Sequence, residues 1–192
     1  LATGAYRLFN CDVVSGSFNP TVLGNGTRKI WTIDTSVAGQ VNLVVAGGYS
    51  NLVWRPGGIN ANWDVTTTTN WVTGSTPDMF WQGDGITFDD TGAYTNVVII
   101  GTMAGPSSLA VNSSSNYSFA GGGSITGAIS LVKNGTGTLI VSNANLHSAG
   151  TAVSGGVVRA ANGGAFGSGT VAVSSGAALE MTNGVSVANA LN

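Results

Sequence analysis

The stretch of sequence that decides the fold is residues 131–159, which read LVKNGTGTLIVSNANLHSAGTAVSGGVVR. Within it, Leu139 and Val141 occupy alternate positions that can face inward, and Thr138, Ile140 and Ser142 occupy the outward positions. A period of two is typical of a short β-strand that turns its apolar residues inward and its other residues outward. Because such a short strand is not stable alone, the stretch predicts pairing with strands of the same kind.

The opening of this strand recurs along the chain. Gly137-Thr138, Gly150-Thr151 and Gly169-Thr170 each precede a strand-like run, at spacings of 13 and 19 residues. One coil of a β-solenoid uses a similar length of chain, buries one side of each strand, and pairs its backbone with the coils on either side. We therefore predict stacked β-coils in this half of the chain.

The composition agrees with an all-β structure. The chain has 192 residues, of which 30 are Gly and 7% are charged, against a norm of about 25% charged. Its one Glu and its frequent Gly and β-branched residues predict almost no α-helix. Since 43% of the residues are apolar, a disordered chain is not expected.

The charge pattern excludes several kinds of partner. A formal net charge of −2 creates no field that would hold nucleic acid or an anionic membrane. No apolar run of about 20 residues is present, so no membrane-spanning helix is predicted.

No signal peptide is visible at the start of the sequence. The chain has a single cysteine, Cys11, which excludes a disulfide within one copy. We interpret Cys11 as a small buried residue.

Residues 131–159 resemble the autotransporter-associated β-strand repeat, also called the passenger-associated transport repeat, of secreted bacterial passenger proteins. The matching positions are Leu131, Lys133, Gly135, Gly137, Thr138, Leu139, Val141, Ser142, Asn145, Ser148, Gly150, Thr151, Val153, Gly155 and Gly156. The sequence departs from the family pattern at His147, where the family usually has Tyr, and at Ala149, which replaces a Gly.

A Trp-rich block upstream is similar to a segment that often precedes such repeats. It comprises Trp54, residues 62–64, residues 70–71 and residues 83–90. The resemblance implies a right-handed parallel β-helix in an extracellular or cell-surface bacterial protein that is not catalytic through the repeat itself.

Composition divides the chain into three parts. We expect a small β unit over residues 1–48, a Trp-rich β segment over 49–102, and solenoid coils over 103–192. In the resembling proteins, a segment like Tyr6–Phe9 closes one unit and the Trp block opens the next. We therefore expect the chain to be one period of a longer array, whose copies are joined in tandem or dock head to tail.

Two interpretations apply to the Trp block. Its aromatic rings either form a surface on which carbohydrate stacks, or pack with Phe80 and Phe88 as the core of a small unit that caps the solenoid. The candidate carbohydrate-binding residues are Trp54, Trp63, Trp71 and Trp81. Surface glycans are the partner that the first interpretation implies.

Three carboxylates form the main candidate for a metal site. Asp84, Asp89 and Asp90 lie close in sequence, and Gly83 and Gly85 flank the first. Hard oxygen ligands on a flexible loop suit a structural Ca²⁺. The alternative is that these residues cap turns through hydrogen bonds to the backbone. No other cofactor is expected.

Catalytic groups are few. The sole histidine, His147, is predicted to be an exposed corner residue with no nearby Asp to orient it, and beyond residue 102 only Lys133, Arg159 and Glu180 are charged. We therefore predict an extracellular, self-associating structural protein with no enzymatic activity. The competing prediction is an adhesin or carbohydrate-binding module.

Overall fold

The computed structural model describes residues 1–16, 26–58, 60–101 and 103–192. These residues form two compact units, Leu1–Tyr49 and Ser50–Asn192. The described residues contain strands, turns and bends but no helix, and therefore no helix long and apolar enough to cross a membrane. The prediction of an all-β chain is confirmed.

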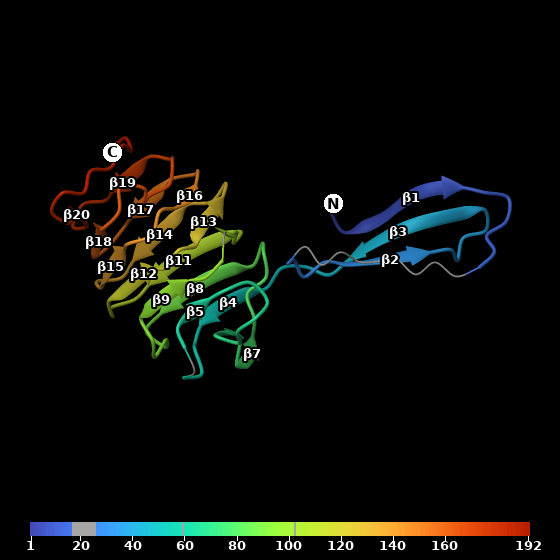
Figure 1. Ribbon diagram of the computed structural model, residues 1–192, viewed down its shortest axis with the longest axis horizontal. Coiled ribbons are helices and arrows are strands. Elements are labelled where there is room, and N and C mark those ends of the chain that lie inside the picture. The colour runs from blue at the N-terminus through green and yellow to red at the C-terminus, as the bar shows by residue number, and fades with distance from the viewer. Residues whose placement is uncertain (17–25, 59, 102) are drawn as a thin grey trace. The chain divides into compact units, whose positions relative to one another are not determined.

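The first unit is a three-stranded antiparallel sheet (Figure 1). Its strands are β1 (Gly4–Asn10), β2 (Ile30–Asp34) and β3 (Gln40–Ala46), in the order β1-β3-β2. Val41 and Val45 of the central strand are its buried apolar residues. Burial is confined to the central strand because it has neighbours on both sides, whereas Leu8 and Phe9 of β1 and Ile30 of β2 are exposed.

The second unit is a β-solenoid built from three sheets (Figure 1). The eight-stranded sheet has the order β19-β17-β14-β11-β8-β4-β6-β7 and comprises β4 (Asn51–Trp54), β6 (Trp71–Thr73), β7 (Thr76–Asp78), β8 (Gly85–Asp89), β11 (Ser108–Asn112), β14 (Leu131–Asn134), β17 (Thr151–Val153) and β19 (Val171–Val173). The six-stranded sheet has the order β20-β18-β15-β12-β9-β5 and comprises β5 (Asn62–Trp63), β9 (Asn96–Ile99), β12 (Tyr117–Ala120), β15 (Thr138–Val141), β18 (Val157–Ala160) and β20 (Ala178–Met181). The three-stranded sheet comprises β10 (Met103–Ala104), β13 (Ser124–Gly127) and β16 (Leu146–His147).

Successive coils stack in parallel and in register. Leu109 pairs with Leu131, Leu131 with Thr151, and Thr151 with Val171, which are steps of 22, 20 and 20 residues. All four side chains are buried and form one inward row. The stacked-coil prediction is confirmed, and β4, β5, β8 and β9 of the Trp-rich segment lie in the same sheets as the later coils.

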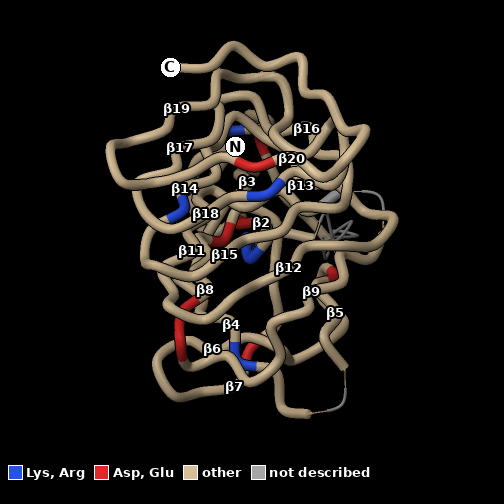
Figure 2. Tube along the Cα trace, turned by 90° about the vertical axis from the view of Figure 1, so that its left-hand side faces the viewer, with Lys and Arg blue, Asp and Glu red and all other residues tan. Residues whose placement is uncertain are grey.

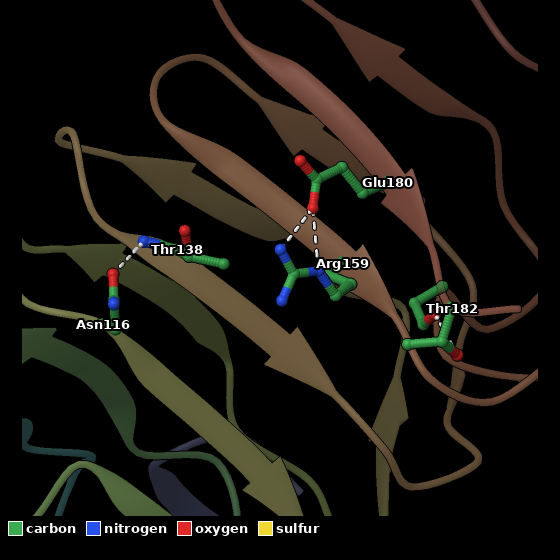
Figure 3. A network of polar contacts seen from close by, with 6 residues as sticks. Asn116, Thr138, Arg159, Glu180 and Thr182 are labelled. Carbon is green, nitrogen blue, oxygen red and sulfur yellow. Dashed lines mark hydrogen bonds and ion pairs between the residues drawn. The ribbon is translucent and has the colours of Figure 1, made fainter.

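The inward and outward positions follow the alternation in the sequence. Leu139 and Val141 are fully buried, whereas Thr138 and Ile140 of the same strand are half-buried. Between coils, the outer face of the six-stranded sheet carries a bond from the Thr138 N–H to Asn116 Oδ1 (2.8 Å) and an Arg159–Glu180 ion pair (Figure 3). Charged residues are sparse along the solenoid (Figure 2), and polar contacts between its coils are mostly neutral.

Glycine directly precedes strands at points where the backbones of two coils lie close together. A Cβ at Gly137 would overlap the carbonyl oxygen of Ser115 in the preceding coil, and one at Gly169 would overlap the backbone of Gly150. Glycine therefore recurs in the Gly-Thr pairs because the backbones of neighbouring coils leave no space for a side chain. Gly150 also has a positive φ of 97°, which glycine adopts more readily than other residues.

Candidate functional site

Three of the four candidate Trp residues lie inside the solenoid. Trp54, Trp63 and Trp71 are fully buried. The Trp54 and Trp71 ring centroids are 4.9 Å apart with planes at 75°, and those of Trp63 and Trp71 are 5.6 Å apart at 74°. These three side chains cannot offer a ring face to a ligand, so the prediction of a Trp stacking surface is wrong for them.

The burial has a physical reason. Trp63 packs edge to face on Phe80 and Trp71 on Phe88, and the rings belong to the same continuous core as the later coils. In a chain rich in small polar residues, these rings are the largest apolar side chains from which the first coil can build a core. Trp81, the fourth candidate, is half-buried, and its backbone N–H donates to Asp84 Oδ2 over 2.9 Å.

The hairpin of β6 and β7 covers the first edge of the eight-stranded sheet. β6 pairs antiparallel with β4, and β7 pairs antiparallel with β6. Pro77 in β7 has no N–H to offer to a further strand, and the Thr73 hydroxyl binds Asp78 Oδ2 over 2.7 Å. Proline at a sheet edge opposes strand addition, so this edge is protected.

The three candidate metal ligands have separate partners. Asp84 is buried, and its Oδ1 accepts from the Ser50 N–H over 2.9 Å. Asp89 accepts from the backbone N–H and the hydroxyl of Thr91. Among the described residues, no group of three or more His, Cys, Asp or Glu side chains is placed to hold a metal ion.

Asp90 fastens a turn of the next coil. Its carboxylate accepts from the Ser113 hydroxyl (2.5 Å) and from the N–H groups of Ser114 and Ser115 (each 2.9 Å). The Ser113 hydroxyl, followed by these backbone donors, holds the pKa of Asp90 far below its usual range. The arrangement matches the turn-capping interpretation of this carboxylate.

His147 is fully buried, so the prediction of an exposed corner residue is wrong. Its Nε2 lies 3.2 Å from Thr151 Oγ1, and its Nδ1 has no hydrogen-bond partner. Burial lowers the pKa of the imidazole, since the apolar interior disfavours the charged form. The residue is in the two-residue strand β16, and the surrounding polar sequence did not show that His147 is the residue that faces inward.

Lys133 is a cation whose burial was not predicted from the sequence. Its Nζ donates to the carbonyl oxygens of Asn134 (2.7 Å), Gly135 (2.9 Å) and Gly155 (3.4 Å). Burial lowers the pKa of this ammonium group. A signal was present in the sequence, because Lys133 is two residues from the inward Leu131 and therefore shares its side of the strand.

A polar network around two buried side chains, Asp64 and Asn70, was also missed. Asn70 Nδ2 donates to Asn60 Oδ1 and to the Asn62 carbonyl, both over 2.9 Å, and Asp64 Oδ1 accepts from the Thr68 N–H over 2.8 Å. Beside this network lies a hollow of about 190 Å³ lined by Gly57, Asn60, Thr67, Thr68, Thr69 and Asn70. The run of Thr and Asn in residues 66–70 was the available signal.

Comparison with known proteins agrees with this architecture. The Passenger-associated-transport-repeat family matches residues 131–160. The adhesin BmaC autotransporter of Brucella suis biovar 1 (strain 1330) is 44% identical over 55 residues, which are 29% of this chain and 2% of that protein. No solved structure gives a significant match. Residues 131–160, which build β14 to β18 of the stack, therefore match the passenger-associated transport repeat.

Proposed function

We propose that the chain is a structural segment of a bacterial cell-surface passenger protein. The in-register parallel stack of coils is the observation that carries the proposal. Each coil hydrogen-bonds to the next through its backbone. The solenoid therefore becomes longer with every added coil, and the added coil extends the existing core. The transport repeat and the partial match to an autotransporter adhesin support a location outside the cell.

The surface of the solenoid suits such a role. Its contacts between coils include the Asn134 Nδ2 to Asn112 Oδ1 bond (2.7 Å) and the Ser118 hydroxyl to Asn96 Oδ1 bond (2.8 Å). Neutral contacts of this kind are less sensitive to salt than exposed ion pairs are. The proposed role is non-catalytic, in keeping with a buried His147.

Labelling of intact cells tests the location. An antibody raised against the chain should bind unpermeabilised cells that produce the whole protein, and protease added outside should remove the signal. Labelling that appears only after permeabilisation would contradict a cell-surface role.

The proposal includes self-association through one edge of the solenoid. Met181 of β20 and Leu191, which bridges to Val171, are 47% and 56% exposed, although each continues an inward apolar row. The opposite edge of the eight-stranded sheet is covered by β7 with Pro77. A further coil, either of a longer chain in tandem or of a second copy, would therefore pack against the β20 edge and not against the β7 edge.

Light scattering and negative-stain microscopy test this part. The wild-type chain should form oligomers or fibres, Met181→Lys should weaken them, and Leu146→Lys should not. Leu146 is a matched control because it is 59% exposed but lies in β16, away from the β20 edge. A wild-type chain that stays monomeric at high concentration would overturn self-association and leave the structural role standing.

Adhesion is the second candidate function. It is favoured by the matching relative, which is an adhesin, although the match covers 2% of that protein. A glycan ligand for this chain cannot stack on Trp54, Trp63 or Trp71, which are buried. Any such ligand requires a site built from other residues.

A further inference from the structure

The dipeptide Asn-Gly is chemically reactive in proteins. The backbone nitrogen that follows an asparagine can attack the side-chain carbonyl carbon, and glycine favours this attack because it has no Cβ and leaves the backbone free to rotate. The pair occurs four times in the chain, as Asn25-Gly26, Asn134-Gly135, Asn162-Gly163 and Asn183-Gly184. Asn25 lies outside the described residues, so the structure distinguishes the other three.

Two of these three asparagines are held by neighbouring groups. Asn134 ends β14, and its Nδ2 donates to Asn112 Oδ1 over 2.7 Å. Asn162 is half-buried, its Oδ1 accepts from the Gly164 N–H over 2.8 Å, and its carbonyl accepts from the Ala165 N–H over 3.1 Å. Each of these side chains must give up a hydrogen bond before its amide carbon can turn toward the next backbone nitrogen.

The Asn183-Gly184 pair lies in an exposed turn. Both residues are exposed, and a bond of 3.0 Å from the Val185 N–H to the Thr182 carbonyl closes the turn around them. Within the described parts of the chain, neither the Asn183 side chain nor the Gly184 N–H has a hydrogen-bond partner. Gly184 has a φ of 82°, in the left-handed region that favours glycine. The two reacting groups are therefore open to solvent and free to approach each other.

Position in the stack explains the contrast between Asn162 and Asn183. Ala160 of β18 pairs with Met181 of β20, and each asparagine follows its member of this pair by two residues. The two Asn-Gly pairs thus occupy equivalent places in consecutive coils. The coil that contains β20 lies beyond Asn162, whereas β20 is itself the last strand of the six-stranded sheet in the described structure.

We propose that Asn183 is a site of spontaneous deamidation at the open edge of the solenoid. The Gly184 nitrogen forms a bond to the side-chain carbonyl carbon of Asn183. The bond from this carbon to Nδ2 breaks, and Nδ2 leaves as ammonia with the proton of the Gly184 N–H. Water then opens the resulting succinimide ring at one of its two carbonyls, which gives aspartate or isoaspartate. The reaction needs no enzyme and no reactant other than water.

The reaction adds a carboxylate close to the β20 edge. Thr182, between β20 and the turn, donates from its backbone N–H to the Ala160 carbonyl over 2.9 Å (Figure 3). Isoaspartate inserts one extra carbon into the backbone directly after this anchor. Charged residues at a sheet edge oppose the addition of further strands. Weaker packing against this edge is a consequence that rests on the proposed function, whereas the reaction itself does not.

Mass spectrometry of the ageing protein tests the reaction. The purified chain is kept folded in warm, mildly alkaline buffer, and a second sample is kept unfolded in urea. Trypsin separates Asn134 from the other two asparagines, and cleavage at Glu180, the single glutamate, separates Asn162 from Asn183. Each peptide that reacts gains the mass difference between an amide and a carboxylic acid.

In the folded chain, the Asn183 peptide should react at least about tenfold faster than the peptides of Asn134 and Asn162. A tenfold difference corresponds to about 1.4 kcal/mol, which is the size of one net hydrogen bond. In urea the three rates should converge, because the sequence around the bond is Asn-Gly in each. Equal rates in the folded chain, a faster reaction at Asn134 or Asn162, or no reaction at Asn183 while the unfolded sample reacts would overturn the proposal.

Three variants complete the test. Asn183→Gln lengthens the side chain by one methylene, which disfavours ring closure, and should abolish the mass gain of its peptide. Asn162→Gln is the matched control in the preceding coil and should leave the rate at Asn183 unchanged. Asn183→Asp carries the charge from the start and should associate less than Asn183→Gln in light scattering. Circular dichroism checks that each variant folds.

The two measurements separate the reaction from its consequence. If Asn183 deamidates as expected but Asn183→Asp and Asn183→Gln associate equally, or neither associates, the effect on packing is refuted and the deamidation site stands. A mass gain that persists in the Asn183→Gln peptide would place the reaction at another residue and contradict the site.

Discussion

The carboxamide oxygen of Asn145 accepts a 2.9 Å hydrogen bond from the backbone N–H of Ile125 in the preceding coil. On its other side, Asn145 Nδ2 donates over 2.8 Å to the Ala165 carbonyl of the following coil. One buried side chain therefore joins three coils at a point where the third coil has turns in place of a strand.

Truncation of this amide should destabilise the solenoid strongly. Asn145→Ala leaves buried backbone groups of two coils without partners, and we expect a loss of about 2–4 kcal/mol in the free energy of unfolding. Asn112→Ala, which removes an exposed amide from the outer face, should change it by about 0.5 kcal/mol or less. Urea titrations of the two variants give the comparison, and equal losses would contradict the bridging role of Asn145.

Stability should fall in mild acid because of His147. The pKa of this imidazole is lowered in the folded state, so the unfolded chain takes up the proton first as the pH falls. The contribution is complete above the ordinary histidine value of about 6.5 and is lost progressively below it. Urea midpoints measured between pH 8 and pH 5 should therefore decline in the wild type.

A His147→Gln variant isolates this effect. His147 is the single histidine of the chain, so its imidazole NMR signals are assigned without ambiguity. The variant should lose most of the decline between pH 7 and pH 5. An imidazole that titrates at or above its ordinary value in the folded chain would refute the prediction.

The coils were predictable from the sequence for a physical reason. Leu139 and Val141 show the inward face directly, and the Gly-Thr openings mark where backbones of neighbouring coils meet. Because each coil contacts the coils next to it along the chain, short motifs carry most of the information about the fold.

The surroundings of single residues were harder to predict. A Trp-rich block has the same composition whether its rings face solvent or form the core, and the decision depends on packing with Phe80 and Phe88, which composition does not show. His147 lies in a two-residue strand that follows a corner. After a corner, the sequence does not show which of the two residues faces inward. The left-handed conformation of Thr66, with a φ of 61°, is not predicted by any sequence motif.

Replacement of the buried Lys133 should be costly, although no carboxylate among the described residues pairs with it. Lys133→Met leaves the carbonyls of Asn134, Gly135 and Gly155 without their donor, and we expect a loss of about 1–3 kcal/mol in the free energy of unfolding. Arg159→Met, which breaks a half-exposed ion pair with Glu180, should cost about 1 kcal/mol or less. A stabilised Lys133→Met protein would mean that burying the charge outweighs its three hydrogen bonds.

Removal of calcium should not change thermal stability. The carboxylates of Asp84 and Asp90 already accept hydrogen bonds from protein donors, and Asp89 is engaged with Thr91. We therefore expect equal unfolding midpoints in millimolar CaCl₂ and in a calcium chelator. A midpoint raised by CaCl₂ in the wild type but not in Asp89→Asn would instead establish a structural Ca²⁺ at this loop.

The lack of space between coils should make position 137 intolerant of any side chain larger than that of glycine. A Cβ there would overlap the Ser115 carbonyl oxygen, which is backbone and cannot rotate away, so Gly137→Ala requires neighbouring coils to move apart. We expect a loss of about 1–3 kcal/mol in the free energy of unfolding, as for overpacked cores. Gly122→Ala is the matched control, because nothing lies within 4 Å of a Cβ at Gly122 and its φ is not in the left-handed region. If urea denaturation gives the same midpoint for both variants, close approach of the backbones is not the reason that glycine opens the strands.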